Sequence, residues 1–335
     1  MSRTRSGRHQ QRGKNRTNQY LALILLVLVV VTALVAYRRI FQPLRQTENL
    51  PLSDAEAVDS VSDPEAEALR SHFERKPEFY TILLSGSDDG NGNSDTNILV
   101  AVDAANDYIY GVSIPRDTKA YWNGRNHKIN AAFGSGGMEL LADVVEDQLG
   151  IPVDYTVSVD LTGFVALVDA IGGVDFEVPI NMNYDDPYQD LYIHFSAGMQ
   201  HLTGEEAVKV VRFRHNNDGT GYGSEDIGRI QTQQNFLKAV AQQTLTVGNL
   251  DKIDEFVKIF NTYVETDLTL GNLAWLGKEA IGMGADAISF STLPNTWNER
   301  DGYIYLNQEE TLVLVNEYLN PYVEDRAAED LNIPV

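Results

Sequence analysis

The 335 residues of this chain include no cysteine, which excludes disulfide bonds and a thiol nucleophile. Motifs of two other enzyme classes are also missing. There is no Gly-x-Ser-x-Gly segment to present a serine nucleophile and no Walker A segment for the phosphates of a nucleotide. The histidines are scattered, and His127, His194, His201 and His215 are expected at the surface or in loops. No covalent nucleophile is therefore evident.

Acidic residues are absent from the first 45 positions, which carry nine basic residues. Residues 20–37 form an apolar run of 18 residues, about the minimum for a helix that spans a ~30 Å hydrocarbon layer. We interpret residues 1–19 as a basic cytoplasmic head and 20–37 as a transmembrane helix, following the positive-inside rule. A cleaved signal peptide is the alternative. Small residues of a cleavage site would then come after the apolar run, but Arg38 and Arg39 stand there. The expected location is the cell membrane, single-pass, with the large domain extracellular.

The rest of the chain is strongly acidic. The formal net charge is −22, and because the first 45 residues contribute nine positive charges, residues 46–335 carry −31. Such a charge repels phosphodiester backbones, so no nucleic acid is expected as a partner. The basic head is expected to orient the span and to contact anionic lipid. An exported domain without disulfides is compatible with a bacterial surface.

Beyond residue 78, apolar runs alternate with helical patterns, which is typical of a layered α/β domain. The acidic segment 38–78 is expected to be an extracellular stalk. No second linker divides residues 79–323, so one domain is expected there, followed by a tail at 324–335. Strands are predicted at 80–84, 98–102, 108–114, 155–159, 174–178 and 287–293. Helices are predicted at 138–149, 162–171, 203–211, 225–245, 253–263, 270–281 and 308–319.

Charged residues stand near the ends of the apolar strands at the start of this domain: Asp88, Asp95, Arg116 and Asp117. Carboxylates beside a core are costly unless they meet a metal, a cation or a ligand. Asp88 and Asp95 flank a glycine-rich loop and suit Mg²⁺, which keeps waters and shares phosphate ligands. A calcium loop of the EF-hand type is the competitor, but its twelfth position, counted from Asp88, is Leu99 rather than glutamate.

Arginines are the second chemical signal. Arg212 and Arg214 share a face only if the backbone is extended between them, and together with Arg116 and Arg229 they would bind a pyrophosphate through forked donors. Arg229 and Gln233 fall on the apolar face of the helix predicted from residue 225. Two alternatives stay open, namely surface ion pairs for the arginines and an interior salt bridge or frayed end for the helix.

Eight short motifs, dense between residues 80 and 245 and looser beyond, give the chain a resemblance to the LytR-CpsA-Psr family. In order they are Leu84-Ser-Gly-Ser-Asp88, Ser94-Asp95-Thr96, Ile114-Pro-Arg116-Asp117-Thr118, Lys128-Ile-Asn-Ala-Ala-Phe133, Gly172-Gly-Val-Asp175, His201-Leu-Thr-Gly-Glu-Glu-Ala207, Arg212-Phe-Arg214 and Gly228-Arg229 through Gln233-Gln234. The resemblance implies a three-layer α/β/α sandwich with a central mixed sheet and a long apolar pocket for a prenyl chain.

The same resemblance implies a phosphotransferase of Gram-positive cell walls. Such an enzyme moves a glycopolymer, such as teichoic acid or capsule, from a polyprenyl-pyrophosphate carrier onto a peptidoglycan hydroxyl. Asp88 and Asp95 match the family's Mg²⁺-associated acids, with Mn²⁺ as the alternative metal. Arg116, Asp117 and Asp95 are the candidate catalytic residues, and Asp117 is a candidate proton acceptor. The residues that match pyrophosphate contacts are Arg116, Lys128, Arg212, Arg214, Arg229 and Gln233.

Two features depart from the family pattern. Thr232 stands where an arginine is common, and the loop between Arg214 and Asp226 is longer and rich in glycine. Two rival functions remain, a non-catalytic adapter that binds polyprenyl lipid or wall polymer and a polyprenyl-pyrophosphate hydrolase. A DNA-binding regulator is not expected, because the 19 residues before the span are too few to fold as a domain.

Overall fold

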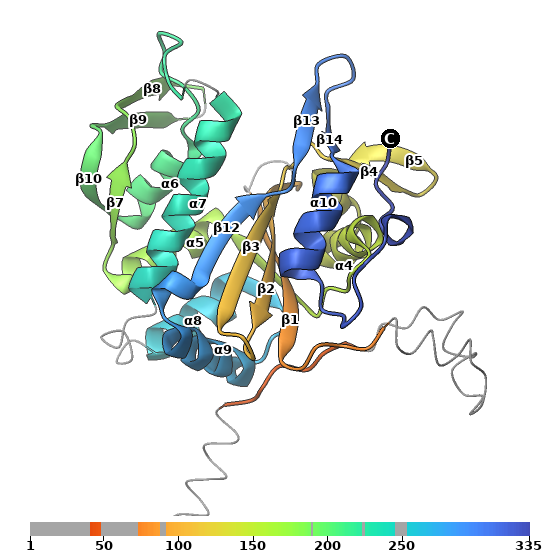
Figure 1. Ribbon diagram of the computed structural model, residues 1–335. Coiled ribbons are helices and arrows are strands. Elements are labelled where there is room, and N and C mark those ends of the chain that lie inside the picture. Colours follow the sequence, from red (N-terminus) through yellow and green to blue (C-terminus); the bar gives the residue numbers. More distant parts are fainter. Residues whose placement is uncertain (1–40, 48–72, 88–91, 189, 223–224, 245–252) are drawn as a thin grey trace, which may run out of the picture. The chain divides into compact units, whose positions relative to one another are not determined.

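The structure is a computed structural model that describes residues 41–47, 73–87, 92–188, 190–222, 225–244 and 253–335 (Figure 1). The predicted cytoplasmic head, the predicted transmembrane helix, most of the predicted stalk and the candidate metal ligand Asp88 lie outside these residues. Within the described ranges, no helix combines the length and the apolar character that crossing a membrane requires.

The described residues fall into two contact units. Residues 41–44 and 269–276 belong to the smaller one, in which the Asn272 side-chain amide donates to the carbonyls of Gln42 at 3.0 Å and Pro43 at 3.2 Å. The larger unit, residues 45–268 and 277–335, contains all of the candidate site residues that the structure describes.

A six-stranded sheet with the order β11-β6-β1-β2-β3-β12 is the centre of the larger unit. β1, β2 and β3 form an antiparallel meander, whereas β6 pairs with β1 and β12 pairs with β3 in parallel. The predicted α/β fold with a central mixed sheet is therefore confirmed. The strands are β1 (Phe79–Ser87), β2 (Ser94–Asp103), β3 (Tyr108–Ile114), β6 (Tyr155–Asp160), β11 (Val264–Thr266) and β12 (Ile288–Thr292).

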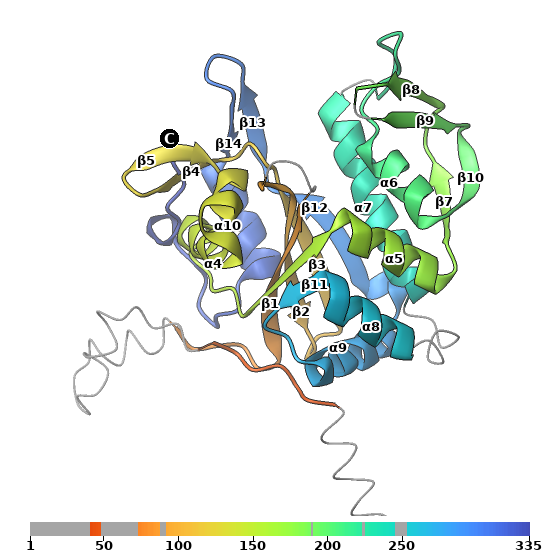
Figure 2. The same ribbon diagram turned by 180° about the vertical axis from the view of Figure 1, so that it is seen from behind.

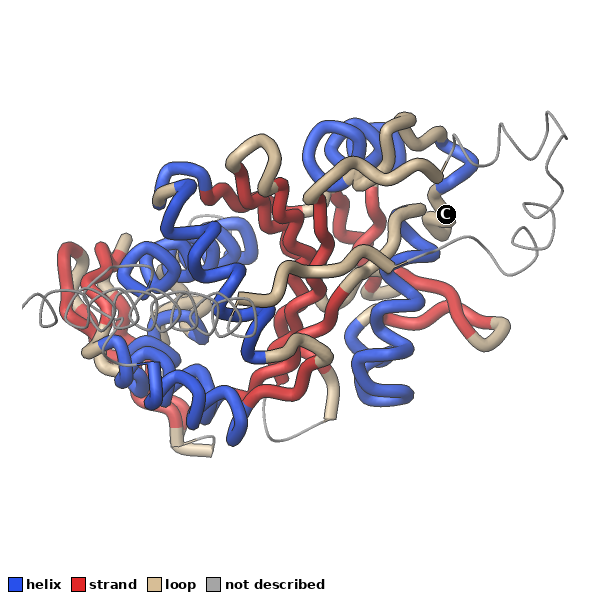
Figure 3. Tube along the Cα trace, turned by 90° about the horizontal axis from the view of Figure 1, so that it is seen from below, coloured by secondary structure: helices blue, strands red, loops and turns tan. Residues whose placement is uncertain are grey.

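Helices contact both faces of this sheet (Figures 2 and 3). On one face, Leu99 and Val112 pack in a single buried cluster with Leu141 of α4 (Asn130–Leu149). Because successive strand residues point to opposite faces, Gly111 lies on the other face. Gly111 pairs with Phe290 of the neighbouring strand β12, and the Phe290 ring would lie 2.4 Å from a Cβ at position 111.

Helix α10 (Gln308–Leu314) and the π-helical turn η3 (Val315–Leu319) cover the first face together with α4. Four further helical elements lie near the C-terminal part of the chain: α8 (Ile253–Tyr263), α9 (Leu270–Met283), η2 (Ala285–Ala287) and η4 (Ala328–Asp330).

A second hydrophobic core lies between residues 161 and 244. It holds Phe176, Phe213 and Phe236, all at least 95% buried. The predicted capping box is present, since the Thr203 and Glu206 side chains each accept a hydrogen bond from the other's backbone. The elements around this core are α5 (Leu161–Ile171), β7 (Val174–Val178), β8 (Met182–Asp186), β9 (Leu191–Phe195), β10 (Gly198–Leu202), α6 (Gly204–Arg212) and α7 (Glu225–Thr244).

Two short hairpins that the sequence pattern does not predict stand beside the central sheet. One joins β4 (Lys119–Trp122) to β5 (Arg125–Lys128), and the other joins β13 (Asn295–Asn298) to β14 (Tyr303–Leu306). Thr118 forms a bridge with Ile304, so the second hairpin is fixed to the chain just before β4.

Parts of the segments expected as stalk and tail pack against the domain. Asp154, whose side chain is fully buried, binds Arg75 at 2.7 Å and accepts from the backbone of Thr47 at 2.9 Å. Arg326 is 3% exposed, and its guanidinium lies over the ring of Tyr322. Residues 45–47, 73–78 and 324–335 are thus bound to the folded unit.

Candidate functional site

A tight turn after β3 presents Arg116 and Asp117. The turn closes where the Thr118 amide donates to the Pro115 carbonyl at 3.0 Å, which places Arg116 and Asp117 at its two central positions. Neighbouring chain segments hold the turn in place: Asn130 donates to the Arg116 carbonyl at 3.2 Å, and Ile304 donates to the Asp117 carbonyl at 2.9 Å.

Asp95 reaches the same end of the sheet from β2. The β1–β2 pairing shifts register between Gly86 and Ser87, opposite the start of β2. Such bulges redirect side chains and occur often beside functional sites. Ser87 also pairs with Asp160 of β6, whose carboxylate accepts from the Gly163 amide at 2.6 Å and caps α5.

Four predicted site residues form one chain of ion pairs. Arg116 binds the carboxylate of Asp95 and lies 4.0 Å from that of Asp117. Asp117 in turn binds Lys128 Nζ at 2.9 Å. All four side chains are between 26% and 41% exposed, so the charges remain accessible to a ligand. The structure therefore brings together Asp95, Arg116, Asp117 and Lys128 as a surface cluster with alternating charge.

The other predicted cations lie around the second core. Arg212 is the last residue of α6, and the backbone is extended at Phe213, which is buried, whereas Arg214 is exposed. Gln233 of α7 donates to the Val211 carbonyl at 2.9 Å, so it sits beside Arg212. Arg229 precedes Gln233 by four residues and shares its side of the helix.

Hydrogen bonds place this second group at the same end of the sheet as the first. Gln234, next to Gln233, donates to Thr292 Oγ1 at 2.9 Å, at the end of β12. The following residue, Leu293, donates to the Ser113 carbonyl at 3.0 Å. Ser113 lies three residues before Arg116, so β12 connects the two groups.

Close packing fixes the first turns of α7. A Cβ on Gly228 would lie 2.4 Å from the Cβ of Tyr222, so glycine is required for this approach. Burial raises the pKa of the Tyr222 hydroxyl, and the positive charge of Arg229 acts against that rise. Gly228 and Tyr222 therefore help to set where Arg229 stands.

Buried polar side chains lie near Asp95 and Arg116, at positions to which the sequence assigns no function. Ser85 donates to Asn97 at 3.2 Å, and both are buried. The Ser94 hydroxyl, the Asn97 amide nitrogen and the Thr118 hydroxyl are buried without a partner among the described residues. Buried polar groups of this kind are costly. Polar residues inside apolar strands were the signal that would have indicated them.

The residues that the structure describes offer one of the two predicted metal ligands. Asp95 is 36% exposed and already binds Arg116, and no three described His, Asp or Glu side chains group closely enough to hold a metal alone. Mg²⁺ needs only one or two carboxylates when waters and substrate phosphates complete its shell. An exposed carboxylate at a strand end fits that requirement, so Asp95 suits a metal shared with a ligand.

Comparison with known proteins decides the family. The model of the LytR_cpsA_psr family matches residues 51–319, which includes the ion-pair cluster and both cores. This chain belongs to the LytR-CpsA-Psr family. The predicted resemblance is therefore confirmed over most of the chain.

Named members of the LytR-CpsA-Psr family are similar to this chain in sequence. The polyisoprenyl-teichoic acid–peptidoglycan teichoic acid transferase TagV of Bacillus subtilis is 32% identical over 263 residues, which cover 75% of this chain and 63% of TagV. The corresponding transferase TagU of Bacillus cereus is 36% identical over 199 residues, 58% of this chain and 62% of TagU. The matches thus span less than two thirds of these relatives.

Solved structures of the LytR-CpsA-Psr family share the fold. The crystal structure of B. subtilis TagV aligns with a TM-score of 0.61 at 27% identity and covers 74% of this chain and 100% of that one. A structure described as TagT bound to LIIa-WTA aligns with a TM-score of 0.57 at 25% identity, over 72% of this chain and 89% of that one.

Proposed function

We propose that this protein is a phosphotransferase that moves a glycopolymer of the teichoic acid or capsule class from a polyprenyl-pyrophosphate carrier to peptidoglycan. The observation that carries the proposal is the chain of ion pairs from Asp95 through Arg116 and Asp117 to Lys128. It stands at the same end of the sheet as the arginines of the second core. Family membership and the names of TagV and TagU support the same reaction.

The pyrophosphate is the group that these cations suit. In this proposal it binds between the turn after β3 and the first turns of α7, where guanidinium groups donate to phosphate oxygens in pairs. Phosphoryl transfer needs positioning and charge stabilisation more than covalent help from the protein, which agrees with the lack of a nucleophile in the sequence. The proposed ligands are Arg116, Lys128, Arg212, Arg214, Arg229 and Gln233.

The proposed reaction is a single displacement. A peptidoglycan hydroxyl oxygen attacks the phosphorus on the glycan side, the bond to the bridging oxygen breaks, and prenyl phosphate leaves with the electron pair. Asp117 accepts the hydroxyl proton, and Arg116 stabilises the charge that develops on the phosphate oxygens. Asp95 orients Arg116 through their ion pair.

Asp88 and Asp95 are the proposed ligands of Mg²⁺, with Mn²⁺ as the alternative. When bound, such an ion neutralises charge on the phosphate oxygens and helps to orient them. In the proposed topology, residues 20–37 span the cell membrane, residues 1–19 stay in the cytoplasm, and the domain lies outside, where both the lipid carrier and peptidoglycan are accessible.

Mass spectrometry tests the proposal directly. The full-length chain in detergent micelles is incubated with a polyprenyl-pyrophosphoryl glycan, peptidoglycan oligomers and Mg²⁺, with and without a chelator. A phosphodiester-linked adduct of glycan and peptidoglycan that disappears with the chelator is expected. Free phosphorylated glycan would instead identify a hydrolase, and unchanged lipid bound to the protein would identify an adapter.

A further inference from the structure

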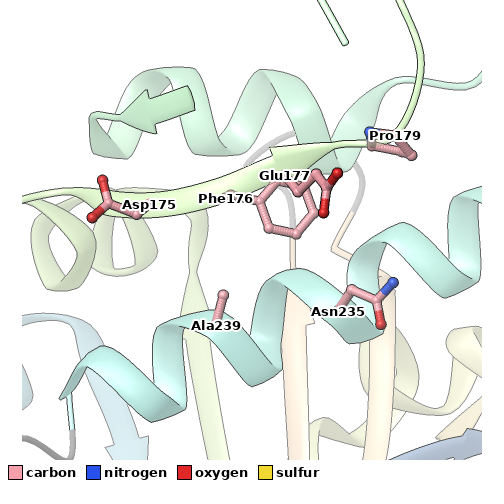
Figure 4. Close-up of a pocket in the computed structure, with 6 residues that line it drawn as sticks. All are labelled: Asp175, Phe176, Glu177, Pro179, Asn235 and Ala239. Carbon is pink, nitrogen blue, oxygen red and sulfur yellow. The ribbon is translucent and has the colours of Figure 1, made fainter. Parts of the chain in front are cut away.

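A groove of about 410 Å³ lies between strand β7 and helix α7 (Figure 4). The proposed phosphoryl transfer does not use it. Its floor is apolar. Phe176 packs edge-on against Phe236 of α7 with ring centroids 5.0 Å apart, which fixes the position of the Phe176 ring. The residues that line the groove are Asp175, Phe176, Glu177 and Pro179 on the strand side and Asn235 and Ala239 on the helix.

One edge of β7 faces this groove and pairs with no strand of the described ranges. β7 pairs with β10 in a two-stranded sheet, so its other edge is open among these residues. The backbone of Asp175 points to that open edge, because its amide donates to Gln243 Oε1 at 3.0 Å and its carbonyl accepts from Gln243 Nε2 at 3.1 Å. Backbone directions alternate along an antiparallel strand. The amide and carbonyl of Glu177 therefore point to the same open edge.

Neither neighbour of Glu177 on this edge offers a free amide donor. On one side the Gln243 side-chain amide satisfies Asp175 as a neighbouring strand would. On the other side stands Pro179, which has no amide hydrogen to donate. Glu177 thus has the one backbone amide that the described part of this edge leaves open, which suits a short peptide unit and not a long strand from another protein.

Charge restricts the ligand further. Glu177 is exposed on β7 and lines the groove. Asp175 is paired with His201 at 2.7 Å. In a domain whose net charge is strongly negative, a peptide that carries a free ammonium group is favoured here over an acidic one.

We propose that this groove binds the peptide stem of the peptidoglycan acceptor, through its backbone at Glu177 and through the ammonium group of its diamino acid at the Glu177 carboxylate. This inference rests on the proposed function, which makes peptidoglycan the acceptor. The groove flanks α7, the helix that also carries Arg229 and Gln233, so a stem bound there holds its glycan strand close to the proposed transfer site.

Calorimetric titration of the full-length chain in detergent micelles tests the proposal. The probes are the tetrapeptide L-Ala-γ-D-Glu-L-Lys-D-Ala and its form with an acetylated lysine side chain. Acetylation is expected to weaken binding about twofold to fivefold, as loss of an exposed ion pair does. Glu177→Gln is expected to weaken binding of the free peptide equally and to leave the acetylated peptide unaffected.

A proline substitution tests the strand edge itself. Glu177→Pro removes an amide that lies outside the β7–β10 ladder, so the fold tolerates it, and it is expected to weaken both peptides beyond the effect of Glu177→Gln. Glu265→Gln, an exposed carboxylate on β11, is the matched control and should change neither. Equal binding of both peptides, no binding by the unchanged chain, or equal effects of Glu177→Gln and Glu265→Gln would overturn the proposal.

The experiment separates this proposal from the proposed function, because binding requires no transfer. If the chain binds the tetrapeptide as described but forms no adduct, the proposed transfer activity is contradicted and the proposed peptide binding in the groove is supported. The opposite result is that the chain binds no tetrapeptide and transfers glycan equally well to peptidoglycan with and without peptide stems. That result would contradict peptide binding in the groove and support the proposed transfer activity.

Discussion

Arg116 is the residue on which the proposed reaction depends most. Its guanidinium is 38% exposed and contacts two carboxylates, so its ion pairs contribute about 1 kcal/mol or less to stability. Charge stabilisation at a transferred phosphoryl group is worth far more to the rate, about 10³-fold or above for an essential arginine. We expect Arg116→Ala to reduce adduct formation by at least about 10²-fold while the melting temperature changes little.

Arg300→Ala is the control for Arg116, because Arg300 is an exposed arginine in the β13–β14 turn. It should leave both transfer and melting temperature unchanged. Near-normal transfer by Arg116→Ala in the mass-spectrometric assay would contradict the site assignment.

Two histidines are expected to titrate on opposite sides of the ordinary value of 6.5. The hydrogen bond that the His201 imidazole donates to the Asp175 carboxylate raises the pKa of His201. Burial against Trp122 and the charge of Arg125 lower the pKa of His127. NMR titration of the imidazole signals should therefore find His201 above 6.5 and His127 below it.

Asp175→Asn should bring the pKa of His201 back toward 6.5. Because folding raises this pKa, the Asp175–His201 pair stabilises the fold fully below the pKa of the unfolded histidine. The contribution is lost as the pH rises through the folded value. Titration of His201 below His127 would show that the side chains are arranged differently.

Helix α7 depends on a glycine at its first turns. Gly228→Ala improves helix propensity by about 1 kcal/mol, but its methyl group would meet Tyr222 at 2.4 Å, and overpacking of this kind costs about 1–3 kcal/mol. Urea unfolding should therefore find the variant less stable and, because Arg229 is adjacent, slower in transfer.

Gly277→Ala is the matched change in helix α9, where the new methyl group meets no described atom within 4 Å. It should raise the free energy of unfolding by about 0.5–1 kcal/mol. A change of the same sign in both variants would mean that Tyr222 yields to the added methyl group.

The elements differ in how well their sequences predict them. β1, β2 and β3 are long apolar runs, and the predicted strands lie within the observed ones. The β4–β5 and β13–β14 hairpins consist of four-residue strands, of which β5 and β13 are mostly polar. Their pairing depends on tertiary contacts such as the bridge from Thr118 to Ile304. Such contacts leave no periodic pattern in the sequence.

The candidate site shows the same division. Arg116 and Asp117 come shortly after the apolar strand β3, so the sequence places them at the end of the sheet, and the alternation of charge follows from the residues themselves. The bond from Gln233 to Val211 and the one from Gln234 to Thr292 join elements that are distant in the chain. Spacing along the sequence contains no information on those distances.

At the scale of the whole molecule, the buried ion pair of Asp154 and Arg75 joins the N-terminal segments to the central sheet. The Asp154 side chain is fully buried and binds Thr47 from one segment and Arg75 and Thr81 from a second. Removal of one partner from a buried pair leaves an uncompensated charge and costs about 3–5 kcal/mol. We expect Asp154→Ala to lower the free energy of unfolding in urea by about that amount.

Lys278→Ala is the contrast for Asp154→Ala. Lys278 binds Glu279 at 2.8 Å, but its side chain is 51% exposed, and such pairs contribute about 1 kcal/mol or less. Similar losses in the two variants would contradict the role assigned to burial.

The turn that presents Arg116 and Asp117 has a consequence for binding. The carbonyls of Pro115, Arg116, Asp117 and Thr118 each accept a backbone hydrogen bond, from Thr118, Asn130, Ile304 and Ile129 respectively. Its backbone is therefore already ordered before any ligand arrives, so a phosphate that binds there loses no affinity to the ordering of this backbone. The amides of Asn130, Ile304 and Ile129 should accordingly be among the slowest in this unit to exchange with deuterium.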